Sequence, residues 1–556
     1  MRIVVTKDQM KSAERAVIDE CGIDAAVLME RAAAFAFDIL SDNVHSCGHA
    51  VILCGMGNNG GDGMALGRIL FEKGWEVDVL TAGDEKKRTA ENEWQAGVLE
   101  RISKGQAAPV PFTKEAADKT LAKGKNVTVI VDALLGIGQT RPPGGVFLEV
   151  VRWINSHEIF TMALDTPTGI NTDTGLMYSE AVKADVTACF GALKSGLLLA
   201  DGHRLSGRIY TDSCGIFYEG PDEKQRIIAY AMGGHEGVMD PAQWKEDAPF
   251  MPGLVMEQED LSILLKRDPS GNKGTFGKIA IWAGNDEITG AAILSVKGAF
   301  ASGAGYIRLL SDASNKDTVI SAVPETVFAN VNGGEKVIDD AIAFAQVIAA
   351  GCGIGRGEKS KQLLTILLDR LTVSDKKPFL VLDADILGML SDEEGSADLW
   401  EKLSRTGCTT VMTPHMAEFS RLSGISIDDI RADRINVCKS FAKEKDIILV
   451  LKDDRTVICA PDGRYFINIY GNDGMAVAGS GDTLLGIIAS CTGQLKNAFT
   501  GAAAGAAIHA LAGDEAAGEL GKAAMSPLDI VKYLPRVMKR IEDMGISHKD
   551  ERTILS

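Results

Sequence analysis

The pattern of apolar and polar positions along the first half of the chain switches repeatedly between two periods. Short apolar runs predict strands at 50–54, 76–81, 127–131, 160–164 and 186–190. Apolar residues three and four apart predict helices at 24–40, 62–73, 89–103 and 145–156, and a first helix through Ile18 behind a capping-box pattern at Thr6–Gln9. Strands that alternate with helices indicate a mostly parallel, doubly wound sheet.

The alternation resumes in the second half after an interruption. Segment 217–256 is rich in Gly, Pro, Met and acidic residues, and we expect a domain boundary inside it, near 220–245. Further strands are predicted at 278–283, 305–310, 346–350, 379–382, 408–412, 447–451 and 455–460, with helices between them and an Ala-rich helical end. The chain is therefore predicted to be α/β, with a Rossmann-like doubly wound domain over 1–220 and a second α/β domain over 245–545.

Composition excludes several classes of protein. A chain of 556 residues is too long for one core, and a net charge of −18 argues against a general nucleic-acid binder. No apolar run reaches the ~20 residues of a membrane span. The 10 cysteines include no Cys-x-x-Cys pair. We expect a cytoplasmic protein that binds neither nucleic acid nor membrane, forms a homo-oligomer and acts on small molecules.

The most informative stretch is Ala478-Gly-Ser-Gly-Asp-Thr483, which is followed by an apolar run. It is typical of a glycine-rich loop opening a helix, where free backbone N–H groups and the helix dipole favour an anion. Asp482 lies inside that anion site, which makes sense if it handles a proton beside a phosphate in transfer. The alternative is a glycine turn with an ordinary Asp cap, the more frequent meaning of so short a pattern.

Three strand ends in the first half carry polar groups beside glycines. Gly55–Gly63 contains Gly-x-Gly-x-x-Gly, and Asp132 and Asp165 each follow a predicted strand. Ligands of open α/β sheets bind at the carboxyl ends of strands, so we expect these three loops to form one site. The first loop could be a dinucleotide fingerprint, with Asp78 as its acid. Its two Asn residues, the Asp at the helix start and the two helices that precede it argue against a plain dehydrogenase.

The Asn-Asn-Gly-Gly-Asp, Asp-Ala-Leu-Leu-Gly-Ile-Gly and Asp-Thr-Pro-Thr-Gly motifs together resemble the YjeF N-terminal family of NAD(P)H-hydrate epimerases over about 1–216, through Phe190–Gly196. The resemblance implies a K⁺ site at Asn59, Asp132 and Thr168, where the family usually has Ser in place of Thr168, and an acid/base role for Asp165. It also implies that the hydrated nucleotide binds to Asn58, Asn59, Gly60, Gly61, Asp62, Gly136, Ile137, Gly138, Gln139, Thr140, Arg141 and Pro142.

The second half resembles the ADP-dependent NAD(P)H-hydrate dehydratases, which are ribokinase-like, over about 255–540. The ordered motifs are Lys273-Gly with Gly277-Lys, Thr289–Ala292, Gly351–Gly355, Val381–Asp385, Thr413–Phe419, Leu449–Lys452 and Asn472–Ala476 before the glycine loop. The resemblance implies Asp482 as the catalytic base and ADP with Mg²⁺ as co-substrate. It places the hydrate at Ala291, Gly353, Gly355 and His415, and the nucleotide at Lys452, Asp453, Asp454, Arg455, Thr456 and Gly481.

The chain departs from that family at two places. Met416 and Ala417 stand where Pro-Gly is common, and Asp453 and Asp454 follow Lys452 where the family commonly has Gly. Two acids near an adenine nucleotide are expected to weaken its binding or alter nucleotide choice.

The resemblances imply a bifunctional repair enzyme that epimerises the R and S hydrates of NAD(P)H and dehydrates the S form at the expense of ADP. Two alternatives stay open at this point. The second half could be a ribokinase-like kinase of another small molecule, such as a vitamin precursor or sugar, because fold does not determine function. The first half could be a nucleotide-binding regulatory or partner-binding domain without catalysis.

Overall fold

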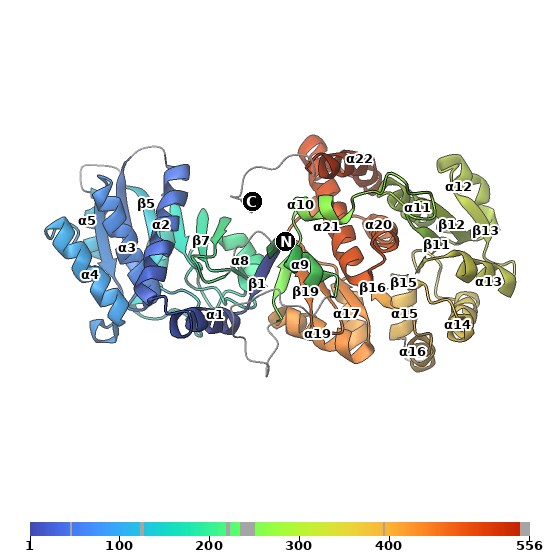
Figure 1. The fold of residues 1–556 in the computed structure, drawn as a ribbon, viewed down its shortest axis with the longest axis horizontal. Coiled ribbons are helices and arrows are strands. Elements are labelled where there is room, and N and C mark those ends of the chain that lie inside the picture. The colour runs from blue at the N-terminus through green and yellow to red at the C-terminus, as the bar shows by residue number, and fades with distance from the viewer. Residues whose placement is uncertain (45–46, 123–126, 218–222, 234–250, 393–394, 545–556) are drawn as a thin grey trace. The chain divides into compact units, whose positions relative to one another are not determined.

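The computed structural model describes residues 1–44, 47–122, 127–217, 223–233, 251–392 and 395–544. The chain divides into two compact units (Figure 1). The N-terminal unit contains Arg2–Arg226, and the C-terminal unit contains Gly253–Lys549 together with Met1 and Ile227–Glu236. The boundary expected near 220–245 stays a prediction, because most of that segment lies outside the described residues. The described part, 223–233, contains helix α9 (Glu223–Ala231).

The N-terminal unit is built on a parallel sheet with strand order β4-β3-β2-β5-β6-β7-β9. Helices α2, α3 and α4 supply the core on one side of the sheet, and α5 and α6 pack against a second core. Its elements are β1 (Arg2–Val5), α1 (Lys7–Asp19), α2 (Ala25–Asn43), β2 (His49–Cys54), α3 (Asn58–Glu72), β3 (Glu76–Thr81), η1 (Glu85–Lys87), α4 (Ala90–Ser103), β4 (Val110–Pro111), α5 (Lys114–Ala122), β5 (Val127–Ala133), α6 (Val146–Asn155), β6 (Thr161–Leu164), β7 (Val186–Phe190), β8 (Leu193–Lys194), α7 (Ser195–Leu198), α8 (Ala200–Leu205) and β9 (Arg208–Asp212).

The C-terminal unit has strands in the order β13-β12-β11-β14-β15-β16-β17-β18-β19-β10. Pairing is parallel from β13 to β17 and antiparallel through β18 and β19. The elements are β10 (Gly253–Val255), α10 (Gln258–Leu264), β11 (Lys278–Trp282), α11 (Thr289–Ala301), β12 (Tyr306–Ser311), η2 (Ala313–Asn315), α12 (Lys316–Ala322), β13 (Val327–Asn330), α13 (Glu335–Phe344), β14 (Val347–Ala350), α14 (Glu358–Val373), β15 (Phe379–Leu382), α15 (Asp385–Ser391), α16 (Ser396–Arg405), β16 (Thr410–Met412), α17 (Met416–Ser423), α18 (Ile427–Ala432), α19 (Arg434–Lys445), β17 (Ile448–Leu451), β18 (Val457–Cys459), β19 (Tyr465–Ile467), η3 (Asp473–Met475), α20 (Ser480–Leu495), α21 (Ala498–Leu520) and α22 (Pro527–Met544).

Helices α20 and α21 form the packed centre of the C-terminal unit. They pack against each other, and α20 also contacts α11, β11, β14 and β15. Their small residues allow this close approach: a Cβ added at Gly486 would lie 1.9 Å from the Ser295 carbonyl oxygen, and one added at Gly505 would lie 2.8 Å from Ile488 Cα. This packing holds the first turn of α20 against the carboxyl ends of the neighbouring strands.

Each strand that the pattern predicted has a counterpart, and the predicted capping box at Thr6 is present. The expectation for α3 was wrong at its start: the helix begins at Asn58, not at 62. Glycines disfavour a helix interior, so Gly60 and Gly61 made this turn look like loop. Tertiary contacts outweigh that cost, because Asn92 on α4 donates to the carbonyls of Gly55 and Gly57 at 3.0 and 2.8 Å.

Several elements were not predicted, among them β9, β10, β13 and β19. They are short or lie at the ends of the sheets, where a strand needs little apolar character of its own. Within the described residues, no helix combines the length and apolar character that crossing a membrane requires.

Candidate active sites

The three polar strand ends of the N-terminal unit meet as expected. Strands β2, β5 and β6 are neighbours in the sheet, so the start of α3, Asp132 and Asp165 reach the same edge. Beyond that edge lies a cavity of about 410 Å³. Its wall includes the predicted residues Asn58, Asn59, Asp62, Gly136, Ile137, Gly138, Gln139 and Asp165.

Other residues predicted for this site lie elsewhere. Gly60 and Gly61 pack behind the cavity, where a Cβ on Gly60 would lie 1.9 Å from the Gly55 carbonyl oxygen. Thr140, Arg141 and Pro142 are exposed at the end of their loop, outside the cavity wall. Asp78 is not at the carboxyl end of its strand: within β3 it pairs with His49 at 2.7 Å, so it does not serve a dinucleotide fingerprint.

Asp132 and Thr168 form a buried pair behind the cavity. The Thr168 amide and hydroxyl each donate to the Asp132 carboxylate at 2.8 Å. Burial raises the pKa of Asp132 to about 6, although these hydrogen bonds oppose the shift. Asn59 lies in the cavity wall and is 8% exposed, and neither its amide nitrogen nor its amide oxygen has a hydrogen-bond partner among the described residues.

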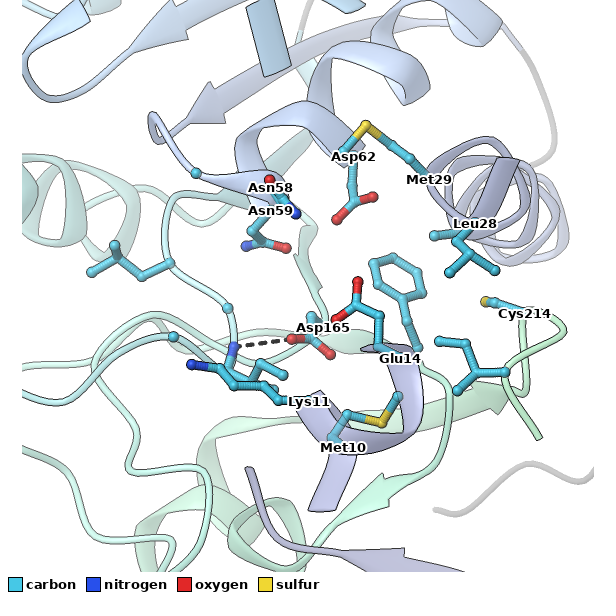
Figure 2. A pocket seen from close by; sticks show the side chains of 18 of the residues that line it. Met10, Lys11, Glu14, Leu28, Met29, Asn58, Asn59, Asp62, Asp165 and Cys214 are labelled. Atoms are coloured by element: carbon cyan, nitrogen blue, oxygen red, sulfur yellow. Dashed lines mark hydrogen bonds between the residues drawn. The ribbon is translucent and has the colours of Figure 1, made fainter. Parts of the chain in front are cut away.

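Asp165 is held in place from two directions. Its Oδ2 accepts the Ile137 amide at 3.0 Å, drawn dashed in Figure 2, and its Oδ1 lies 2.5 Å from Lys194 Nζ. The backbone of Asp165 is left-handed, with φ 63°, which is strained for a non-glycine residue and frequent at functional sites. Lys194 is 1% exposed; burial would lower its pKa, but Asp165 outweighs that effect and the pKa is raised.

Two further residues of this site were missed from the sequence. Lys194 lies in the Phe190–Gly196 motif but was given no role there. Glu14 lies on α1 beside the buried Met10, Ala13 and Val17, and lines the cavity. A carboxylate on the apolar stripe of an amphipathic helix was the signal available for it.

In the C-terminal unit, α20 begins at Ser480 as the glycine-loop pattern predicted. Gly479 caps the helix at φ 95°, a conformation that favours glycine, and in the part of the chain that the structure describes no side chain caps the first-turn amides. Asp482 lies in this first turn and is hydrogen-bonded to the Cys352 side chain. Burial raises the pKa of Asp482, the Cys352 bond lowers it, and Asp383 raises it further.

Lys452 faces the same helix end. Its Nζ binds both carboxylate oxygens of Asp383 at 2.9 and 3.0 Å, and Asp383 is 2% exposed. A Cβ added at Gly481 would lie 3.4 Å from Lys452 Nζ and 3.6 Å from Asp383 Oδ2. A charged lysine therefore borders the first turn of α20, where it would attract a phosphate.

The two acids that follow Lys452 form ion pairs with a buried arginine of a neighbouring helix. Arg434 is buried on α19, and its Nη2 lies 2.7 Å from Asp453 while its Nη1 lies 3.3 Å from Asp454. Arg455 is itself buried and donates to the Ile469 carbonyl. The segment 453–455 thus has an internal structural role, which reduces the repulsion that two free acids would exert on a nucleotide.

The residues predicted for the hydrate are brought together in part. A Cβ on Gly353 would lie 3.0 Å from Ala291 Cβ, and the Gly355 amide donates to Asp385 at 2.8 Å. His415 instead caps α17: its Nδ1 accepts the amides of Ala417 and Glu418. Its side chain is 52% exposed, while its backbone bridges to Lys452.

The two sites and their sheets are those of a two-domain α/β enzyme, with a Rossmann-like half and a ribokinase-like half. The model of the YjeF-related protein N-terminus matches residues 25–196, and that of NAD(P)H-hydrate dehydratase matches residues 279–536. A bifunctional NAD(P)H-hydrate repair enzyme of Thermofilum pendens is 32% identical over 555 residues, covering 97% of each chain.

The bifunctional NAD(P)H-hydrate repair enzyme of Escherichia coli is 29% identical, over 96% of this chain and 93% of that one. A solved ribokinase-like superfamily protein of Enterococcus faecalis is 28% identical, with a TM-score of 0.47, covering 53% of this chain and 99% of its own. The chain belongs to the family of bifunctional NAD(P)H-hydrate repair enzymes.

Proposed function

We propose that the two units carry out successive steps of one repair, with the N-terminal site epimerising the R and S hydrates and the C-terminal site consuming the S form. Family membership over 97% of the chain supports both activities. The observation that carries the residue assignment is the carboxylate of Asp482 in the uncapped first turn of α20, beside Lys452. The alternative kinase of a vitamin precursor or sugar is disfavoured by the epimerase-type N-terminal unit.

The chemistry of dehydration follows from the leaving group. The hydrate carries a hydroxyl on carbon 6 of the reduced nicotinamide ring, and hydroxide leaves poorly. Asp482 takes the hydroxyl proton while the oxygen accepts a phosphoryl group from ADP, and the first-turn amides of α20 with Lys452 stabilise its charge. The ring nitrogen then expels inorganic phosphate as a C6=N bond forms, and loss of a proton from C5 gives the C5=C6 bond of NAD(P)H; AMP is the product left by the phosphoryl transfer.

Mg²⁺ is proposed to arrive with ADP. This ion is usually bound through one or two carboxylates and the phosphates of the substrate, not in an all-protein cage. In the part of the chain that the structure describes, no three His, Cys, Asp or Glu side chains form a metal-binding group. The phosphates are therefore the expected main ligands.

The experiment that tests the activity is direct. Mixed NADH-hydrate epimers are incubated with ADP and Mg²⁺, and NADH absorbance and phosphate are followed together. We expect equal amounts of both products and conversion of both epimers. Phosphate transfer to a sugar or vitamin precursor without recovery of NADH would contradict the proposal.

For the N-terminal site we propose a K⁺ ion held by Asn59, Asp132 and Thr168. The residues fit, because the buried Asn59 amide has no hydrogen-bond partner among the described residues and the Asp132 carboxylate is fully buried beside Thr168. Carboxylate, amide and hydroxyl oxygens suit a hard cation. Bound there, K⁺ would balance the Asp132 charge and hold the start of α3 against the neighbouring loop.

Replacing K⁺ with tetramethylammonium is expected to slow epimerisation and lower the unfolding midpoint of the N-terminal unit, since a bound ion stabilises the folded state. Both quantities are measured in the two salts at equal ionic strength. The Asn59→Ala variant should respond much less than the wild type to the exchange of cation. If the wild type has the same epimerisation rate and the same unfolding midpoint in both salts, the proposed K⁺ site is contradicted.

Gly136→Ala is expected to lower epimerisation about 10- to 100-fold, because misplacing a reacting group by ~1 Å costs up to about 10² in rate. The added Cβ would lie 2.9 Å from Asp165 Oδ2, so the carboxylate must move. The matched control is Gly144→Ala in the same loop, where an added Cβ meets no atom within 4 Å. The measurement is the initial rate of epimer interconversion in both variants. Equal rates would contradict the proposal that the Asp165 carboxylate takes part in epimerisation.

A further inference from the structure

A carboxyl group of α1 enters the N-terminal cavity from a helix that precedes the residues matched by the model of the YjeF-related protein N-terminus. Met10, Lys11 and Glu14 of this helix line the cavity, whereas the match to that model begins at residue 25. Figure 2 shows the side chains of Glu14, Asp62 and Asp165 converging on the cavity from three different elements. Asp165 rises from the carboxyl edge of the sheet and Glu14 from α1.

Burial and the neighbouring charges together raise the pKa of Glu14 and so favour its protonated, neutral form. Burial is the main cause that raises its pKa, and Asp165 raises it next. The lysines that face it, Lys194 on β8 and Lys11 on its own helix, lower the pKa, while Glu91 of α4 raises it. Lys194 is instead in direct contact with Asp165 at 2.5 Å. The cavity thus holds a carboxyl group disposed to be protonated and a carboxylate paired with a buried ammonium.

Epimerisation at carbon 6 needs both kinds of group. The hydroxyl must leave from one face of the ring and return to the other, so a proton is delivered on the first face and removed on the second. Two carboxyl groups in different protonation states are the usual way in which one site does both.

Resting on the epimerase function proposed above, we propose that Glu14 is the second proton-transfer residue of the N-terminal site, serving the ring face opposite to the one served by Asp165. The Glu14 carboxyl gives its proton to the C6 hydroxyl. The C6–O bond breaks, its electron pair leaves with water, and the ring-nitrogen lone pair forms a C6=N bond.

Water then adds to C6 from the other face. Its oxygen lone pair forms the new C6–O bond, the C6=N pair returns to nitrogen, and the released proton goes to Asp165. One water is lost and one gained, and a proton has passed from Glu14 to Asp165. The reverse reaction uses the same two groups with their roles exchanged.

Asp62 is the competing residue, because it lines the same cavity and burial, Asp165 and Glu14 raise its pKa well above the usual value. It lies on α3, one turn after the start of the helix and beside the residues predicted to bind the nucleotide. We assign Asp62 to hydrogen bonding of the substrate, so that its loss should raise KM while both epimers continue to react.

The test separates oxygen exchange from inversion. Each pure epimer of NADH hydrate is incubated in H₂¹⁸O with the wild type or with Glu14→Gln, Glu14→Asp, Asp165→Asn or Asp62→Asn, and isotope content and configuration are followed. In Glu14→Gln we expect inversion to fall at least about 10²-fold. Only the epimer whose hydroxyl faces Asp165 should still exchange oxygen faster than in buffer, and Asp165→Asn should show the opposite preference.

A merely structural role of Glu14 would slow exchange of both epimers together and would not yield opposite preferences. Glu14→Asp, which keeps the carboxyl group, should recover part of the inversion. Glu20→Gln, at the exposed C-cap of the same helix, should leave it unchanged. The proposal is overturned if Glu14→Gln inverts within about threefold of the wild type, or if Asp62→Asn alone shows the one-epimer pattern. Failure of the wild type to invert would instead refute the epimerase function itself.

Discussion

Replacing Asp482 with Asn is expected to lower the rate of dehydration by about 10² to 10⁴, the usual loss when a general base is removed. Asn has nearly the same shape, so the first turn of α20, Lys452 and ADP binding should be preserved. The measurements are recovery of NADH from pure S hydrate and ADP affinity by calorimetry. Near-normal turnover would exclude Asp482 as the base.

The matched control for this variant is Asp473→Asn, which removes an exposed acid shortly before the same helix and should leave the rate unchanged. The pH dependence gives a second readout. Burial raises the pKa of Asp482, and the base must be ionised, so the wild-type rate should fall as the pH is lowered through that raised pKa. The Asp482→Asn variant should lose this fall.

Replacing Asp165 with Ala is expected to stop epimerisation while dehydration of pure S hydrate continues at the wild-type rate. Asp165 and Asp482 lie in different compact units and at the edges of different sheets. An equilibrated mixture should therefore show fast recovery of the S fraction, followed by a slow phase set by spontaneous epimerisation. The wild type should convert both fractions in one phase.

The Asp482→Asn variant is the complementary control: it should interconvert the R and S hydrates but convert neither of them to NADH. Because Asp165→Ala leaves Lys194 buried without its carboxylate, it is also expected to destabilise the N-terminal unit by about 3–5 kcal/mol. Asp165→Asn, which keeps a side chain able to hydrogen-bond, checks that the kinetic result does not come from unfolding. Equal loss of both activities in both variants would contradict separate sites.

The order of strands and helices was predictable because it depends on the apolar period within short segments of the sequence. Each apolar run in the first half became a strand of one parallel sheet, and the convergence of the Asp132 and Asp165 loops followed from where parallel strands end. The start of α20 was likewise predictable, since Gly479 at φ 95° and the apolar run behind it act within a few residues.

The wrong start of α3 had a non-local cause. Asn92, more than thirty residues away, secures the turn that the glycines disfavour. The ion pairs of Asp453 and Asp454 are also non-local, because their partner Arg434 lies on α19 and nothing in the spacing of the sequence indicates the pairing. The expectation that these acids weaken nucleotide binding stays a prediction.

By itself, therefore, the sequence determined the α/β class, the two resemblances and the residues at the strand ends, because backbone preference, apolar period and glycine position act over short distances. The tertiary structure alone decided which charges meet. It placed Lys194 on Asp165, Lys452 on Asp383, and Glu14 of the first helix in the cavity of a sheet whose first strand begins at His49. The carboxylates raise the pKa of the two lysines against the effect of burial, whereas burial raises the pKa of Glu14.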